Sequence, residues 1–245
     1  MARISRPFLL LSTRPEDEAA RGELQSFAAA MEVDVDDIEQ RRVESAALGR
    51  VNLDNYSGVL LGGSPFCNTD VLKSALQLRV EREIGSLVAA ILDRDFPLLG
   101  ACYGIGAIGT AIGARLGTTY AEAAGPVELS LVDAPANDPL LADVPARFST
   151  IVGHKEAVDD LPDLATVLVS GDQCPVQMFK VGQNVYATQF HPELTAEALE
   201  LRLRVYAHLN YFDLEELDEI LEAAYSTDYT ANNSILANFA KRYAR

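Results

Sequence analysis

Short apolar runs alternate with segments of helical period through the first half of this 245-residue chain. Short runs bounded by turn residues are typical of buried strands, whereas apolar residues three and four positions apart are typical of helices. We therefore expect strands at 7–12, 56–61 and 96–101, and helices at 16–31, 71–94 and 103–116. The apolar stripe expected on the longest helix comprises Leu72, Leu76, Val80, Ile84, Leu87 and Ile91. Apolar strands separated by helices predict a parallel sheet that is covered on both faces.

The second half of the chain shows a different pattern, in which strand-like segments follow one another without long helices between them. They are expected at 127–132, 148–152, 165–169, 176–181 and 185–190, and they predict an antiparallel extension of the same sheet. Residues 195–245 are expected to be helical, with Leu199, Leu203, Tyr206 and Leu209 on one face and an acidic helix after Phe212. No repeat or flexible linker is present, so we expect one α/β domain over 1–245, with a core at about 5–195 and a helical extension at about 195–245.

The composition excludes several classes of function. With 36 acidic and 20 basic residues the net charge is -16, which argues against a nucleic-acid partner, since phosphate binding needs clustered Lys and Arg. No stretch approaches the roughly 20 apolar residues of a membrane span, and the N-terminus lacks the pattern of a secretory signal, so the cytoplasm is the default expectation. The cysteines Cys67, Cys102 and Cys174 are odd in number and lack CxxC spacing, which argues against disulfides and a zinc site.

The segment from Leu98 to Gly106 joins a buried strand directly to a helix through Cys102, with glycine on both sides. This order is typical of a nucleophile elbow, in which glycines avoid side-chain clashes around a strained turn. A thiol placed there meets the positive end of the helix, which favours the thiolate. The backbone N–H of Tyr103 also becomes free to face a developing oxyanion. On this segment alone, a buried cysteine that only packs is an equally good interpretation.

A second segment strengthens the functional interpretation. The strand at 185–190 ends in His191-Pro192-Glu193, and residues two apart in an extended chain point to the same side, so His191 and Glu193 can lie next to each other. A carboxylate bonded to one imidazole nitrogen fixes the tautomer and leaves the other nitrogen to accept a thiol proton. Both Cys102 and His191 are expected at the carboxyl ends of strands, where open α/β sheets bind their ligands. We therefore expect a catalytic triad of Cys102, His191 and Glu193.

These motifs resemble those of the class I glutamine amidotransferases, whose hallmarks are a G-x-C-x-G elbow and a later H-P-E. Within that family the chain looks most like stand-alone proteins similar to the glutaminase domain of GMP synthase. The stretches that support this likeness are 60–65, 153–158 and 189–193, and the resemblance covers about 55–195. It implies a flavodoxin-like open sheet, the same Cys-His-Glu triad and a small-molecule substrate, without a metal or cofactor.

The resemblance also implies a substrate site. The N–H groups of Gly63 and Tyr103 would form the oxyanion hole, with Gly62 in the same loop, and the backbone around Lys155 and Glu156 would help to hold a glutamine-like substrate. Family members often carry glutamine four residues after the nucleophile, where its amide helps to position the substrate. This chain has Gly106 at that position, which leaves the triad intact and opens the pocket to other γ-glutamyl compounds.

Three functions are compatible with these residues. The first is glutamine hydrolysis through a γ-glutamyl thioester, with any ammonia transfer requiring a separate synthetase subunit, because the chain contains no GxxxxGK[ST] loop. The second uses the same triad as a γ-glutamyl hydrolase or peptidase, and Gly106 favours it. The third is a catalytically silent binding module on the same scaffold, in which Cys102 is unreactive. Comparing the turnover of glutamine with that of γ-glutamyl peptides distinguishes the first function from the second. Adduct formation at Cys102 excludes the third.

Overall fold

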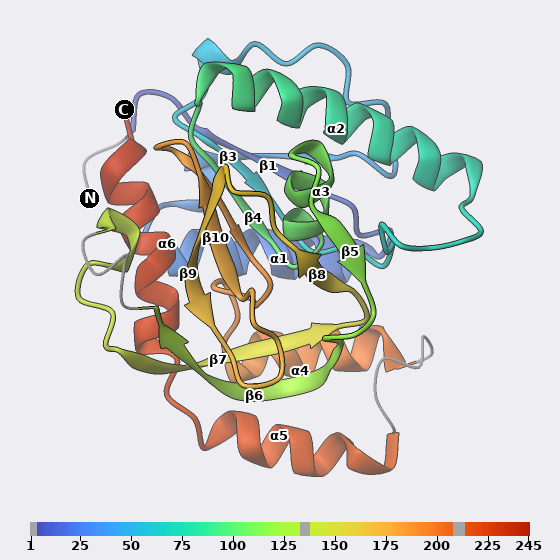
Figure 1. Ribbon diagram of the computed structural model, residues 1–245, viewed down its shortest axis with the longest axis vertical. Helices are drawn as coiled ribbons and strands as arrows, with labels where there is room; N and C mark the ends of the chain where they lie inside the picture. Colours follow the sequence, from blue (N-terminus) through green and yellow to red (C-terminus); the bar gives the residue numbers. More distant parts are fainter. Residues whose placement is uncertain (1–3, 133–137, 208–213) are drawn as a thin grey trace.

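A mixed sheet of nine strands runs through the molecule in the computed structural model, which describes residues 4–132, 138–207 and 214–245 (Figure 1). The order across the sheet is β2 (Ile38–Arg42), β1 (Phe8–Ser12), β3 (Val59–Leu61), β4 (Leu98–Ala101), β11 (Val185–Thr188), β10 (Met178–Val181), β9 (Ala165–Ser170), β6 (Glu122–Leu131) and β7 (Arg147–His154). Strands β2, β1, β3, β4 and β11 pair in parallel, and every later pairing in this order is antiparallel. The expected α/β sheet with an antiparallel extension is confirmed.

Helices cover both faces of the parallel half of this sheet. The α-helices of the described residues are α1 (Asp17–Ala30), α2 (Ala75–Arg94), α3 (Tyr103–Ala111), α4 (Ala196–Val205), α5 (Leu217–Tyr225) and α6 (Thr230–Tyr243). In β1, Phe8 and Leu10 join the buried cluster that includes α1 and α6 side chains, whereas Leu9 and Leu11 join the cluster that includes α2 and α3 side chains. Successive strand residues point to opposite faces, so covering both faces makes the strand apolar throughout.

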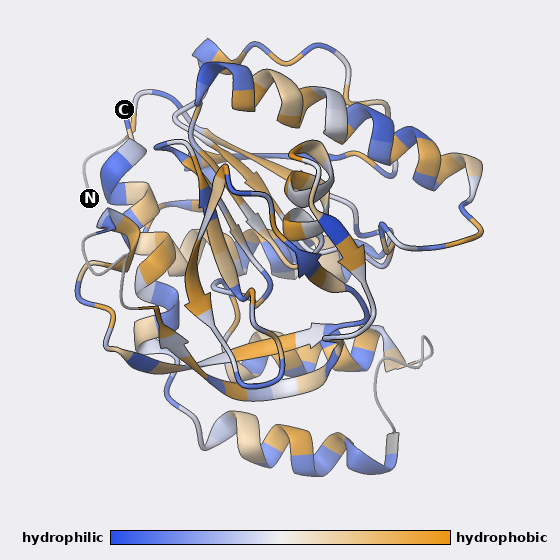
Figure 2. Cartoon of the chain, in the orientation of Figure 1, coloured by the Kyte–Doolittle hydropathy of each residue, from blue (hydrophilic) through white to orange (hydrophobic). Residues whose placement is uncertain are grey.

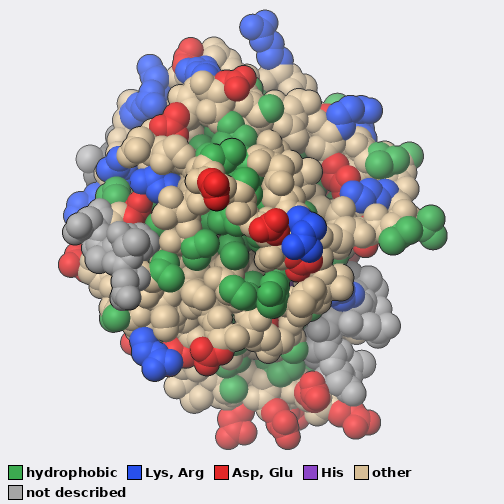
Figure 3. All heavy atoms as spheres, in the orientation of Figure 1, with side chains coloured by type: hydrophobic (Ala, Val, Ile, Leu, Met, Phe, Trp, Pro, Cys, Tyr) green, Lys and Arg blue, Asp and Glu red, His purple; other side chains and the backbone are tan. Residues whose placement is uncertain are grey.

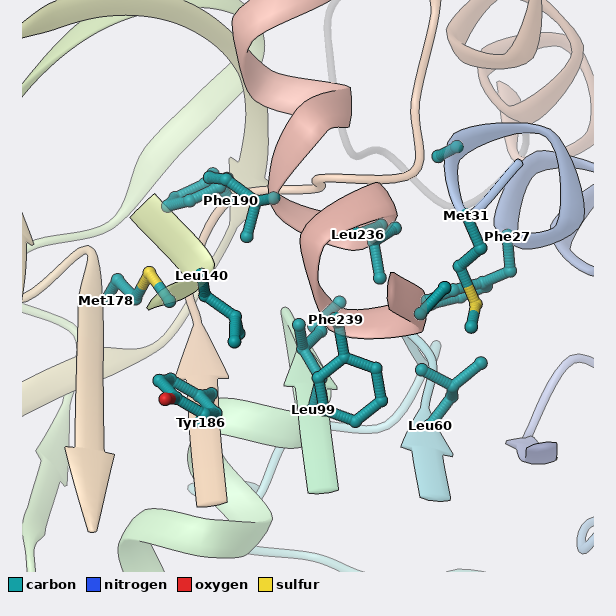
Figure 4. Packing of buried hydrophobic residues seen from close by; sticks show 14 of the residues in the cluster. Phe27, Met31, Leu60, Leu99, Leu140, Met178, Tyr186, Phe190, Leu236 and Phe239 are labelled. Atoms are coloured by element: carbon teal, nitrogen blue, oxygen red, sulfur yellow. The ribbon is translucent and has the colours of Figure 1, made fainter. Parts of the chain in front are cut away.

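The C-terminal helix α6 contributes to the main core on one face of the sheet. Figure 4 shows Leu236 and Phe239 on α6 above Leu60 and Leu99 of the neighbouring strands, and Figure 2 shows the matching apolar colour on both layers. The ring of Phe239 lies 5.9 Å from that of Phe8, centroid to centroid, at a tilted angle of 46°. Residues from the two ends of the chain therefore pack together.

Helix α2 begins later than the sequence pattern predicts. Ser74 caps it by accepting a hydrogen bond from the backbone N–H of Gln77, and the helix starts at Ala75 instead of residue 71. Leu72 precedes the helix and is 92% exposed, and Leu76 is 41% exposed, so their place on the buried stripe was wrongly expected. The buried stripe comprises Gln77, Val80, Ile84, Leu87, Val88 and Ile91.

Three strands were not expected from the sequence, namely β2, β5 (Arg115–Gly117) and β8 (Ala157–Asp160). Strand β2 lies at the edge of the large sheet and is polar, which is common where one edge of a strand faces solvent. Strands β5 and β8 form a separate antiparallel pair. The helix expected to reach residue 116 ends at Ala111, because Gly113 adopts a φ of +82°, which favours glycine, and turns the chain into β5.

The acidic segment near the C-terminus lies on the surface. Figure 3 shows acidic side chains along the lower edge of the molecule, where Figure 1 places α5, and the exposed acids of this segment are Glu215, Glu216, Asp218, Glu219 and Glu222. Leu209 and Phe212, named in the sequence pattern, lie outside the described residues. Within the described parts of the chain, no helix has the length and apolar character needed to cross a membrane.

We predict that Phe239→Ala lowers the free energy of unfolding by about 3–5 kcal/mol, because it leaves a cavity between α6 and the sheet. Chemical denaturation measures this change. The control is Leu72→Ala, which removes a side chain that is 92% exposed and should change stability by less than about 0.5 kcal/mol. Equal effects of the two variants would contradict the role of α6 in the core.

Candidate active site

Cys102 lies at the junction between β4 and α3 with an unusual backbone conformation. Its φ of 53° and ψ of -96° place it in a region that residues with a side chain rarely adopt. Hydrogen bonds on both sides of the turn hold it there: the N–H of Cys102 donates to the Thr188 carbonyl at 2.8 Å, and the N–H of Ile105 donates to the Cys102 carbonyl at 3.0 Å. This is the geometry of a nucleophile elbow.

Gly100 allows the helix to pack closely against the strand at this elbow. A Cβ atom at residue 100 would come within 3.0 Å of the Gly104 backbone and 2.8 Å of the Ile108 side chain. Backbone atoms cannot move away as a flexible side chain can, so an alanine there would push α3 away from β4. The glycines around Cys102 therefore allow α3 to lie close to β4 without side-chain clashes, as the sequence pattern indicates.

His191 and Glu193 follow β11 and lie next to each other. His191 Nδ1 is 2.8 Å from Glu193 Oε1, and both side chains are buried. The backbone of this segment is fixed from two directions, since the N–H of His191 donates to the Ile151 carbonyl at 2.9 Å and Asn232 of α6 donates to the His191 carbonyl at 3.0 Å. An ionised carboxylate only accepts hydrogen bonds, so the proton between the two lies on Nδ1 and leaves Nε2 with a lone pair.

Burial and neighbouring charges shift the pKa values of this pair. Burial by itself raises the pKa of Glu193, but His191 and Arg202 overcome that effect and lower it to about 2. Burial lowers the pKa of His191, and although Glu193 opposes this shift, Arg202 and Arg14 reinforce it. The resting pair is therefore an ionised carboxylate beside a neutral imidazole, which is the form of a general base.

The pKa of the Cys102 thiol is shifted away from the thiolate that its place at a helix N-terminus was expected to favour. Burial raises its pKa to about 12, although the positive charges of Arg14 and Arg202 act in the opposite direction. A reaction through the sulfur would require the thiol to lose its proton, and His191 lines the same hollow as Cys102.

Arg202 is a member of the site that the sequence pattern did not reveal. One of its guanidinium nitrogens lies 3.0 Å from His191 Nδ1, and the other donates to Glu193 Oε1 at 3.2 Å. A signal was present, because Arg202 falls on the apolar face of α4 between Leu199 and Tyr206. A charged residue on a buried helix face requires a buried partner, and Glu193 provides it.

Arg14 is a second buried arginine beside the site. It follows β1, and its Nε donates to Glu23 Oε1 at 2.8 Å in a pair with side chains only 4% and 0% exposed. Its Nη1 donates to the Tyr206 hydroxyl at 3.3 Å. Burial alone lowers the pKa of Arg14, but Glu23 and Tyr206 raise it above the usual value, so the guanidinium stays charged.

The expected oxyanion loop lies beside His191 of the expected triad. A Cβ atom on Gly63 would come within 2.6 Å of Arg14 Nη2 and 3.2 Å of His191 Cε1, so a side chain there would displace both. Gly62 lies one residue away with its α-carbon against the Glu23 carboxylate. Tyr103 is the first residue of α3, and such N–H groups have no acceptor within their own helix.

Glu156 connects the far wall of the site to the loop that follows β3. Its carboxylate accepts hydrogen bonds from the Asn68 N–H at 2.9 Å, the Asn68 side-chain amide at 2.8 Å and the Thr69 N–H at 2.7 Å. The Asn68 amide covers Gly106, where an added Cβ would lie 2.3 Å from Asn68 Nδ2. A larger side chain at residue 106 would therefore occupy the space that the Asn68 side chain fills. Lys155, next to Glu156 in the chain, is exposed.

Two hollows meet at Cys102. The first is lined by polar residues that include Cys67, Tyr103, Lys155, Glu156 and Gln189. The buried Oε1 of Gln189 has no hydrogen-bond partner. The second hollow contains His191, Arg14 and Arg202 among walls of Leu194, Leu199 and Leu203. Cys102, the expected nucleophile, lines both hollows. Gly106 lines neither of them, because the Asn68 side chain covers it.

Among the described residues, the group with donor atoms close enough to bind a metal ion is Glu122, His154 and Cys174, within 4.8 Å of one another. His154 Nδ1 donates to the Glu156 carbonyl at 3.0 Å, and its Nε2 lies 2.8 Å from the Glu122 carboxylate. The cluster thereby supports the wall that carries Glu156.

Comparison with known proteins agrees with this geometry. The sequence profile of the family described as Glutamine amidotransferase class-I matches residues 24–203. One subunit of the glutamine-hydrolyzing GMP synthase of Methanothermobacter thermautotrophicus is 33% identical over 138 residues, which are 56% of this chain and 65% of that protein. Gamma-glutamyl peptidase 3 of Arabidopsis thaliana is 31% identical over 157 residues, which are 60% of this chain and 59% of that protein. The chain thus spans less than two thirds of the length of these relatives.

The fold has a close match among solved structures. A glutamine amidotransferase from Thermotoga maritima superimposes with a TM-score of 0.78 over 99% of this chain and 100% of the other, at 20% sequence identity. At that identity the likeness shows the fold, and the profile match over most of the chain shows the family. The chain belongs to the class I glutamine amidotransferase family.

Proposed function

We propose that this protein hydrolyses the side-chain amide of glutamine or a related γ-glutamyl compound through a thioester on Cys102. The observation that carries the proposal is the placement of Cys102, at a strained strand-to-helix junction, in one hollow with His191, whose Nδ1 is held by Glu193 at 2.8 Å. A cysteine, a base and a residue that orients the base are the parts that nucleophilic acyl transfer requires.

The proposed reaction uses His191 as both base and acid. His191 Nε2 accepts the thiol proton as the sulfur of Cys102 attacks the amide carbon, and Gly63 and Tyr103 donate their N–H groups to the oxyanion. His191 then gives the proton to the departing amine nitrogen, the C–N bond breaks and a γ-glutamyl thioester remains. Water that loses a proton to His191 attacks the thioester, and glutamate leaves as the thiol regains its proton. Ionised Glu193 stabilises the imidazolium in each step.

The polar hollow suits the glutamyl half of such a substrate. Lys155 offers a positive charge for the α-carboxylate, whereas the Glu156 carboxylate and the unpartnered Gln189 Oε1 offer acceptors for the α-ammonium. Because one relative is by name a subunit of GMP synthase, we propose that ammonia passes to a separate synthetase subunit when glutamine is the substrate.

A γ-glutamyl peptidase activity is the second candidate. The Asn68 amide fills the space above Gly106, so the more open pocket expected there is not formed, and the acyl pocket does not distinguish the two candidates. A relative carrying this activity in its name is 31% identical to the chain. Both candidates share the thioester and differ in the amine that leaves.

We predict that a chloromethyl ketone analogue of glutamine alkylates Cys102 with one adduct per chain, detected by mass spectrometry. Cys102→Ala removes the adduct and reduces amide hydrolysis by at least about a thousandfold, since the covalent route is lost. Cys174→Ala is the control, because Cys174 is buried away from both hollows and should keep full labelling. An unlabelled wild-type chain would support the silent-module interpretation.

The pH dependence of kcat/KM reports the free enzyme. The active form has a neutral His191, whose pKa is lowered from 6.5, and a protonated Cys102, whose pKa is about 12. Activity is lost as the pH falls through the His191 pKa, so we predict an acidic limb with its midpoint below 6.5 and a plateau that extends into the alkaline range. A midpoint above 6.5 would contradict the assignment of a neutral, buried base.

Arg202→Gln should move that acidic limb to higher pH by about one unit, because it removes a positive charge that opposes protonation of His191. Arg202→Lys keeps the charge and should restore most of the wild-type profile. Arg204→Gln is the matched control, since Arg204 lies on the same helix and pairs with Glu200 on the surface. Its profile should equal that of the wild type, and an identical shift in both variants would argue against a local effect of Arg202.

A further inference from the structure

The hollow that contains His191 has no assigned ligand. Its cavity volume is about 70 Å³. About 10–15 Å³ of such volume is enough to hold one water, and ammonia is as small as water, so ammonia alone leaves most of this space empty. A larger group than ammonia is needed to fill it.

The chemistry of the proposed reaction decides which half of the substrate enters this hollow. His191 must give its proton to the departing nitrogen, so that nitrogen lies on the side of His191. Among the residues that line the two hollows, His191 belongs only to this one, whereas Lys155, Glu156 and Gln189 belong only to the other. The glutamyl half and the amine half therefore extend from Cys102 in opposite directions.

The walls of this hollow are apolar. Helix α4 contributes Leu199 and Leu203, β7 contributes Ile151, and Leu194 follows the catalytic histidine (Figure 1). These side chains belong to one buried apolar cluster beneath α4. Binding an apolar group against these side chains is favourable, and the gain in free energy is proportional to the apolar area removed from water.

The two arginines of the hollow do not make it an anion site. Arg14 already pairs with Glu23 at 2.8 Å, and Arg202 pairs with Glu193 at 3.2 Å. Each guanidinium is thus neutralised by a buried carboxylate, and the hollow has no excess positive charge with which to bind a carboxylate. The chemistry favours an uncharged alkyl or aryl group.

We propose that this hollow binds the amine half of a γ-glutamyl amide whose nitrogen carries an apolar alkyl or aryl group. The inference rests on the proposed thioester reaction and adds the substrate class. Attack by Cys102 sulfur breaks the C–N bond, the amine leaves into the hollow with a proton from His191, and water later releases glutamate. Atoms and charge balance with water as the one co-reactant.

The test compares wild-type kcat/KM for γ-glutamylethylamide and γ-glutamyl-n-butylamide, with glutamine alongside, by measuring released glutamate. Ethylamine and butylamine are equally basic, so the ratio of the two amides reports the hollow and not the intrinsic reactivity. Burial of a methylene is worth about fourfold in an equilibrium, so two methylenes predict a preference of about 15-fold for the butylamide. A ratio of one or below overturns the inference.

Two filling variants make the test specific. Ala124 lines the hollow, so Ala124→Leu should reduce the butyl-to-ethyl ratio towards one, and Leu203→Phe on α4 should do the same from the opposite wall. The matched control is Ala123→Leu on the same strand, where the side chain is exposed and outside the hollow. It should keep the wild-type ratio. Unchanged ratios in both filling variants would also overturn the inference.

The same measurements separate this inference from the proposed function. If no amide releases glutamate and no thioester or alkyl adduct forms at Cys102, then the proposed function fails and the inference fails with it. If glutamine forms the thioester and releases glutamate while the longer amides do not react faster, then the triad works and the inference about the hollow is wrong.

Discussion

The parallel pairing of β4 with β11 is the constraint on which the site depends. The register places Ala101 opposite Thr188, and the N–H of Cys102 continues the ladder by donating to the Thr188 carbonyl at 2.8 Å. Both strands run in the same direction, so the residues after them emerge at the same edge of the sheet. Cys102 and His191 are 89 positions apart in sequence, yet this pairing fixes them at one edge. The strain at Cys102 is tolerated because buried strands on both sides hold the turn.

The charges of the site form a balanced buried set. Glu193 and Glu23 each face an arginine, so neither carboxylate is buried without a partner. The same charges act on Cys102. Arg14 and Arg202 favour a thiolate there, but burial has the larger effect and raises the pKa, and Glu193 and Glu156 act in the same direction as burial. In the proposed reaction, the thiol proton leaves for His191 while Gly63 and Tyr103 stabilise the oxyanion.

The sequence predicts the parts of this molecule that depend on local order. The alternation of strands and helices, the elbow at Cys102 and the pair His191 and Glu193 are each encoded within a few residues, where period and spacing carry the information. Arg14 and Asn68 come from loops whose positions depend on pairing between distant strands, so no local pattern identifies them. The start of α2 was missed for a different reason, since Leu72 continues the apolar period but lies before the Ser74 cap and stays in solvent.

The contact of Asn68 with Gly106 links the proposed substrate pocket to the loop that carries Gly63. Asn68 belongs to the segment between β3 and α2 that also carries Gly63, and Glu156 fastens this segment to the opposite wall through three hydrogen bonds. A side chain on α3 would instead be held by a helix and could vary independently of that loop. In this chain a ligand that displaces Asn68 must also disturb the loop that positions Gly63. In the proposed reaction, the Glu156 carboxylate would therefore couple the fit of the glutamyl group to the formation of the oxyanion hole.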